Sequence, residues 1–190
     1  ALTLISTPLD ITVSDTAVTT VDITSGITNT YDSYEFHFVN IHPENSGGSA
    51  QLLFQVNAYD PSEGTPQLTG FNETMTTTAF RAYHQENDAG GAVDYRTGED
   101  QAQGVAYEII MEGISNGDDQ SGSGILTLYA PSSTTYVKHF TSVSNTTLGA
   151  GTKQDFHAGY INTALAITQI SFKLTSGNIH AGTIKMFGVS

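Results

Sequence analysis

The six histidines are the first residues to test for metal chemistry. His37 and His42 are five positions apart, so they fall on opposite faces of one expected strand. The other four lie in separate segments, and neither H-x-H nor H-E-x-x-H occurs. Their spacing does not predict a zinc site.

Carboxylates in loops offer a second kind of metal chemistry. Asp118 and Asp119 follow Asn116 and Gly117 in a polar stretch. Calcium takes about six to eight oxygen ligands from such flexible segments, so these two aspartates are the calcium candidates. The alternative is an ordinary solvated turn, which Asn, Gly and Asp also favour. No other cofactor is expected.

Catalysis would require a pair of carboxylates or an activated nucleophile. Glycoside hydrolysis needs two carboxyl groups that face each other across a cleft. Glu35 stands alone in its strand, and Glu108 and Glu112 share a single segment. Ser123 lies in G-S-G rather than in a G-x-S-x-G turn, and the chain has no cysteine. We therefore expect a protein that is not an enzyme.

Tyrosines could bind sugars by stacking on their rings. Tyr83, Tyr95 and Arg96 lie close together in the sequence and are the glycan-binding candidates. The alternative is that the tyrosines belong to the core or to sheet faces. Tryptophan, the residue that stacks best, is absent.

Strands must position these residues, because apolar and polar side chains alternate along most of the chain. Tyr34, Phe36 and Phe38 share one face of a strand, and similar segments recur through the sequence. Turn residues separate the segments, and Thr175–Asn178 is typical of a hairpin turn between the last two strands. The pattern predicts an all-β protein, an antiparallel two-sheet β-sandwich of the jelly-roll type.

One segment favours a helix instead. Asp100 and Gln103 have the spacing of a capping box, and Glu108 and Glu112 repeat at an interval of four. We expect one short helix near residues 101–112.

A single jelly-roll domain is expected over residues 21–190. Residues 1–20 are expected to form either an N-terminal arm or the first strand of the sandwich. An arm would use Leu2, Leu4 and Ile5 for self-association or for contact with a larger assembly, by adding a strand to a neighbour.

The charge balance excludes several classes of partner. The net charge is −13 with only six Lys and Arg residues, so neither nucleic acid nor an anionic membrane is an expected partner. Residues 1–120 hold 18 acidic and 2 basic side chains, whereas residues 121–190 hold 1 acidic and 4 basic. This asymmetry predicts either a head-to-tail contact between copies or, if strands from both halves interleave, no surface asymmetry at all.

Three stretches carry a resemblance to a known family: Tyr31–Pro43, Ser123–His139 and Ser176–Gly188, the last ending in GTIKMFG. Together they resemble virion structural proteins of tailed phages of marine bacteria, including cyanophages. The resemblance implies a particle component displayed outside the virion, on the head or in the tail fibres. It carries over no catalytic or binding residue.

The expected function is therefore that of a non-enzymatic virion structural protein, assembled in the host cytoplasm and displayed on the particle surface. The first expectation is a capsid decoration or cement protein that forms a homotrimer and binds the major capsid protein or a tail component. The alternative is a tail-fibre or knob protein that binds host-surface glycans. A polysaccharide-degrading enzyme with the same fold is a third hypothesis.

Overall fold

The computed structural model describes residues 1–5, 9–11, 18–44, 49–60, 70–147 and 149–190. These residues form β-strands, connecting loops and one 3₁₀ turn, η2 (Thr97–Glu99), with no α-helix among them. The strands are β1 (Leu2–Leu4), β2 (Leu9–Ile11), β3 (Thr20–Ile23), β4 (Ser33–Pro43), β5 (Ala50–Tyr59), β6 (Met75–Gln85), β7 (Gly91–Tyr95), β8 (Ala102–Gly104), β9 (Glu108–Ile114), β10 (Gly122–Tyr129), β11 (Lys138–Thr147), β12 (Gly151–Ile161), β13 (Ala166–Leu174) and β14 (Ile179–Val189).

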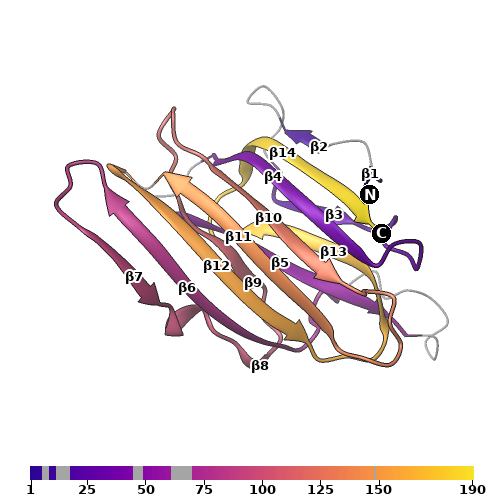
Figure 1. The fold of residues 1–190 in the computed structure, drawn as a ribbon. Helices are drawn as coiled ribbons and strands as arrows, with labels where there is room; N and C mark the ends of the chain where they lie inside the picture. The colour runs from indigo at the N-terminus through magenta and orange to yellow at the C-terminus, as the bar shows by residue number, and fades with distance from the viewer. Residues whose placement is uncertain (6–8, 12–17, 45–48, 61–69, 148) are drawn as a thin grey trace.

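Two antiparallel sheets pack face to face (Figure 1). The larger sheet has ten strands in the order β1-β14-β4-β10-β11-β12-β6-β7, with β2 also paired to β14 and β8 to β6. The smaller sheet has four, in the order β3-β13-β5-β9. The chain crosses between sheets at each step from β3 to β6, and β10 to β12 form a meander. The expected all-β two-sheet sandwich is confirmed.

The helix expected near residues 101–112 is wrong. Residues 102–104 form β8 and residues 108–114 form β9. Asp100 caps no helix; its Oδ1 accepts a hydrogen bond from the backbone N–H of Ala79 on β6. Both glutamates lie on β9, whose pairing with β5 contains register shifts, so its side chains do not alternate strictly.

The hairpin expected at residues 175–178 is also wrong, although the turn itself is present. β13 belongs to the smaller sheet and β14 to the larger one, so the segment between them connects the two sheets. Turn chemistry in the sequence identified the change of direction, but the partner of each strand is set by long-range packing.

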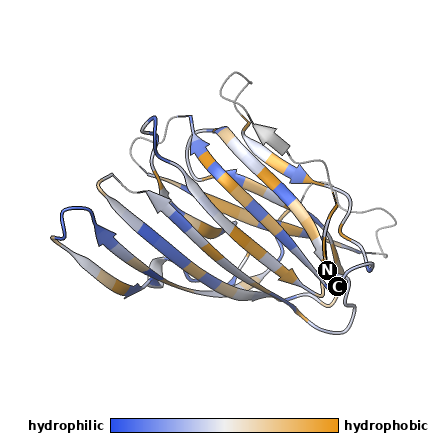
Figure 2. Cartoon of the chain, turned by 45° about the horizontal axis from the view of Figure 1, so that its top comes forward, coloured by the Kyte–Doolittle hydropathy of each residue, from blue (hydrophilic) through white to orange (hydrophobic). Residues whose placement is uncertain are grey.

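The hydrophobic core lies between the sheets where β4, β10 and β14 cover β5 and β13. Phe172 of β13 packs against two rings of β4, with centroids 5.5 Å from Phe36 and 5.1 Å from Phe38. Phe54 of β5 packs against Phe140 of β11 at 4.9 Å. Figure 2 shows hydrophobic residues concentrated in this half of the sandwich and more hydrophilic ones toward β6 and β7. The sandwich therefore changes from an apolar interior to a polar one toward the β6–β7 edge.

The first five residues pair with the domain's own sheet. β1 runs antiparallel to β14, with Leu2 opposite Val189 and Leu4 opposite Phe187. The Ile5 N–H donates to the Met186 carbonyl at 2.9 Å, and the Ile5 side chain packs against the core. Part of the 1–20 stretch lies outside the described residues, but the described part places Leu2, Leu4 and Ile5 in or beside a first strand.

The strands of the two halves of the chain interleave in the larger sheet, where β4 lies between β14 and β10. Two of the four lysines in residues 121–190, Lys138 and Lys153, are buried. The charge asymmetry of the sequence is therefore not carried to the surface as one basic half and one acidic half.

Candidate functional site

A cluster of ionisable side chains lies between the sheets near the β6–β7 edge. Glu112 of β9 accepts hydrogen bonds from Arg81 at 2.7 Å, from Arg96 at 2.7 Å and from Lys153 at 3.0 Å. These are three of the six Lys and Arg residues of the chain. We call Arg81, Arg96, Glu99, Glu112, Lys153, Asp155 and His157 the ionic cluster.

The position of β9 explains why charged residues meet here. β9 is the edge strand of the smaller sheet, whereas the larger sheet continues beyond β11 to β12, β6 and β7. Alternation turns Arg81 of β6 and Lys153 of β12 to the inner face of the larger sheet, where they reach Glu112. The outer edge of the sandwich is thus closed by ion pairs rather than by apolar side chains.

Hydrogen bonds between the sheets also tie the backbone of β9 to β11 and β12. Ser144 donates to the Ile110 carbonyl at 3.0 Å, and Thr146 donates to the Glu112 carbonyl at 3.0 Å. The Glu112 N–H donates to Asp155 Oδ2 at 2.9 Å. The edge strand therefore uses side chains of the opposite sheet as hydrogen-bond partners, and this explains several of the buried hydroxyl groups.

Burial and charge set the pKa values of the cluster. Burial acts to raise the pKa of Glu112, but its hydrogen bonds and charges, first from Lys153 and then from the arginines, outweigh it and lower that pKa to about 2. Burial raises the pKa of Glu99 to about 6 and that of Asp155 to about 6. Burial also lowers the pKa of His157 to about 4, so this imidazole is neutral at pH 7.

Several polar atoms of the cluster have no hydrogen-bond partner among the described residues: Glu99 Oε2, Asp155 Oδ1 and both ring nitrogens of His157. His157 Nε2 lies 3.9 Å from Glu99 Oε2, and both side chains are almost fully enclosed. Glu99 and His157 are thus enclosed between the sheets, where a solute outside the protein does not reach them.

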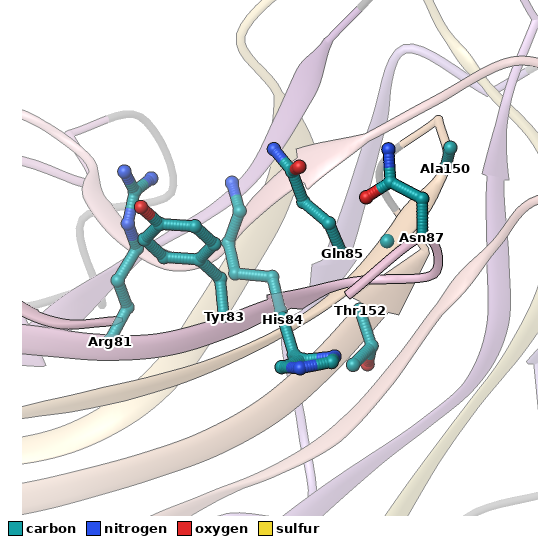
Figure 3. Close-up of a pocket in the computed structure, with 9 residues that line it drawn as sticks. Arg81, Tyr83, His84, Gln85, Asn87, Ala150 and Thr152 are labelled. Atoms are coloured by element: carbon teal, nitrogen blue, oxygen red, sulfur yellow. The ribbon is translucent and has the colours of Figure 1, made fainter. Parts of the chain in front are cut away.

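A cavity of about 340 Å³ opens beside the cluster at the end of β6 (Figure 3). Arg81, Tyr83 and Lys153 line it from the inner face of the larger sheet, and Gln85 and Asn87 lie at the adjoining turn. The Arg81 guanidinium carbon lies 5.6 Å from the centre of the Tyr83 ring. The lining therefore combines an aromatic ring, side-chain amides and two cations that are paired with Glu112.

The three glycan-binding candidates do not form one site. Tyr83 lines the cavity. Tyr95 lies on the outer face, opposite Phe80, and its hydroxyl donates to Asp100. Arg96 belongs to the ionic cluster, where it contacts Glu99 and Glu112. The three residues lie close together in the sequence, but alternation along the strands places Tyr83 and Tyr95 on opposite faces of the sheet.

The calcium candidates, Asp118 and Asp119, line a second cavity of about 610 Å³ together with His42 and His180. Among the described residues, no group of three or more His, Asp or Glu side chains is arranged to hold a metal ion. Calcium binding stays a prediction from the sequence.

The outer face of the larger sheet is the feature that the sequence analysis did not single out. Its part between β10 and β6 is formed by every second residue from Thr76 to His84 on β6, from Ser123 to Tyr129 on β10, from His139 to Thr147 on β11 and from Thr152 to Tyr160 on β12. Val93 and Tyr95 of β7 extend it. None of these residues is Asp, Glu, Lys or Arg, whereas β4 and β14, which continue the face beyond β10, carry Glu35 and Lys185 on it.

An apolar row crosses this face. Five residues stand directly opposite one another on neighbouring strands: Ile125, Val143, Phe156, Phe80 and Tyr95. Phe80 and Phe156 are stacked, with ring centroids 4.7 Å apart. Val143 is 42% exposed, Phe80 46% and Tyr95 61%. We call these five residues the apolar row.

The outer face of the smaller sheet is different, because other segments of the chain cover part of it. Gln55 of β5 donates to the carbonyls of Glu73, Val105 and Ala106, and it is fully buried. Tyr107 donates to Ser171 of β13. The apolar row has no such cover from the described residues.

The chain matches no protein-family model, no curated protein and no solved structure. In the described residues, no helix is long and apolar enough to cross a membrane.

Proposed function

We propose that this chain is a non-enzymatic structural protein of a tailed-phage particle, displayed on the virion surface as a capsid decoration or cement protein. The resemblance in the sequence supports a particle component. The observation that carries a role in assembly is the uncharged part of the outer face, from β10 to β7, with its apolar row. Exposed apolar groups arranged in a continuous patch are typical of protein contact surfaces.

Such a protein acts by binding other proteins of the particle rather than by catalysing a reaction. A decoration protein binds across junctions of the shell, and the area that it buries resists the pressure of packaged DNA. The net charge of −13 keeps its exposed surfaces from binding DNA, since like charges repel. The ionic cluster would keep the sandwich closed under these conditions.

Mass spectrometry of purified particles tests this function. In a phage that encodes the chain, we expect a copy number comparable to that of the major capsid protein. A few copies per particle would instead support the hypothesis of a tail-fibre protein. Absence of the chain from particles that contain all other virion proteins would contradict a structural role.

The cavity beside Tyr83 favours adsorption as a second candidate function. Its aromatic ring and side-chain amides suit the ring faces and hydroxyl groups of a sugar. If the protein binds host-surface glycans there, Tyr83→Ala weakens binding to host cells, whereas Tyr136→Ala, at an exposed site away from the cavity, does not. Equal binding by both variants would contradict this use of the cavity.

A further inference from the structure

We propose that a second copy of this chain binds to the outer face of the larger sheet, with the two sheets face to face about a two-fold axis. This inference builds on the proposed contact function and names the partner. The axis lies along β12, the middle strand of the apolar row, so that Phe156 of one copy lies near Phe156 of the other.

The apolar row suits such a contact because it is nearly symmetric about its middle. Phe80 and Val143 are the cross-strand neighbours of Phe156 on its two sides, and Tyr95 and Ile125 end the row. Rotation about β12 brings Tyr95 of one copy over Ile125 of the other, and Phe80 over Val143. Every apolar side chain of the row then meets an apolar partner, as a two-fold contact requires.

Charge favours a second copy over a partner of opposite charge. A basic partner would need carboxylates to pair with, and the outer-facing positions of β6, β10, β11 and β12 carry none. The neighbouring strand β4 carries one, Glu35, which already contacts His37 at 2.7 Å. Two chains of net charge −13 repel each other, and contact through an uncharged face keeps their carboxylates furthest apart. The threonines beside the row can hydrogen-bond to the same groups on the other copy.

The size of the face is that of a stable interface. Five strands spaced about 4.8 Å apart span about 24 Å, and ten residues at about 3.3 Å each span about 33 Å. The face therefore offers about 800 Å² per copy, which is the usual size for a specific complex. Packed sheets lie about 10 Å apart, so the side chains of the row can interdigitate.

A two-fold pair differs from the homotrimer expected from the sequence. A cyclic trimer needs two different contact surfaces on each copy, whereas this face contacts itself. The geometry therefore assigns two copies, not three, to the contact made by the apolar row.

Sedimentation equilibrium on the full chain tests the inference. We expect a mass of two copies at micromolar concentration. Phe80→Glu should raise the dissociation constant of the pair about tenfold or more, because it places a carboxylate against Val143 of the other copy. The matched control is Tyr136→Glu, which adds the same charge at a residue 74% exposed outside this face, and it should leave the constant within about twofold.

Cross-linking locates the axis. The chain has no cysteine, so Ala158→Cys, two residues from Phe156 on the same face, introduces a single thiol. A short bis-maleimide should join two copies of this variant, but not two copies of Thr135→Cys, which lies in an exposed loop. Unchanged melting temperatures of the variants show that they fold.

Three results would overturn the inference: a single-copy mass at about 200 µM, a mass of three copies, or a pair that Phe80→Glu leaves intact. These results are independent of particle mass spectrometry. A chain that is present in particles but monomeric in solution refutes the pair alone, and a chain that pairs but is absent from particles refutes the proposed function alone.

Discussion

Glu112 is the residue on which the ionic cluster depends, because three cations share its carboxylate. A buried charge that loses its only partner keeps its desolvation cost without the compensating attraction. Lys153 is almost fully buried, so it cannot turn to water when the carboxylate is removed.

Glu112→Gln should therefore lower the free energy of unfolding by about 3–5 kcal/mol, as measured by urea denaturation at pH 7. The matched control is Asp94→Asn, which removes the other, more exposed carboxylate partner of Arg81, at 3.4 Å, and should cost less than about 1 kcal/mol. Similar losses in the two variants would show that the three cations do not depend on Glu112.

Buried carboxyls with raised pKa values make stability depend on pH in an unusual direction. Burial raises the pKa of Glu108 to about 7, above its ordinary value of 4.5. Between these values the folded chain holds a proton that the unfolded chain has released, so stability falls as pH rises through 7. Glu99 and Asp155 act in the same direction, and His157, whose pKa is lowered to about 4, acts against them.

We expect the free energy of unfolding to decrease from pH 5 to pH 8, and Glu108→Gln to remove part of this slope. The glutamine keeps the shape without the buried charge, so at pH 8 the variant should be more stable than the wild type by about 2–3 kcal/mol. Glu86→Gln, at an exposed carboxylate, should leave the slope unchanged. A stability that rises steadily from pH 5 to pH 8 would contradict the buried state of Glu108.

Among the strands, β9 is an edge strand that pairs with β5 on one side and is also held by polar groups of the opposite sheet. Thr146 of β11 supplies a hydroxyl to the Glu112 carbonyl, and it is fully buried. Removing this donor leaves a buried carbonyl without that partner, which costs more than the loss of an exposed hydrogen bond.

Thr146→Val, which keeps the shape of the side chain, should lower the free energy of unfolding by about 1–2 kcal/mol and speed amide exchange in β9. Thr141→Val, at an exposed position on the same strand, should cost less than about 0.5 kcal/mol. Faster exchange in all strands equally would show that β9 does not open separately.

Alternation in the sequence predicted the strands well because it is a local property. It could not show which face of a strand is buried. On β12, Phe156 and Ala158 face outward while Asp155 and His157 are buried, the reverse of what hydrophobicity alone suggests. The inner face of β12 carries part of the ionic cluster, whose other members come from β6, η2 and the residue before it, and β9. No local sequence pattern predicts contacts between residues so far apart in the chain.

The helix predicted near residues 101–112 was wrong for a related reason. Glu108 and Glu112 at an interval of four fit either a helix or a strand, and pairing of β9 with β5 decides between them. Alternation along β6 and β7 places Tyr83 at the cavity and Tyr95 on the opposite face. The sequence was thus sufficient for the fold class and for many of the strand positions, but not for β8 and β9 or for the candidate sites.

For the whole molecule, the net charge of −13 and the uncharged surface around the apolar row together determine how association responds to salt. Repulsion between two acidic chains is screened as ionic strength rises, because the Debye length falls from about 30 Å at 0.01 M to about 3 Å at 1 M. An interface without ion pairs loses nothing to this screening. We therefore expect the pair of copies to become tighter, with its dissociation constant falling several-fold between 0.05 M and 0.5 M NaCl in sedimentation experiments.

A head-to-tail contact between a basic patch and an acidic patch would respond in the opposite direction, since its attraction would be screened. Lys138 and Lys153 are buried, which leaves few basic groups for such a patch. Weaker association at 0.5 M NaCl would therefore locate the contact away from the apolar row.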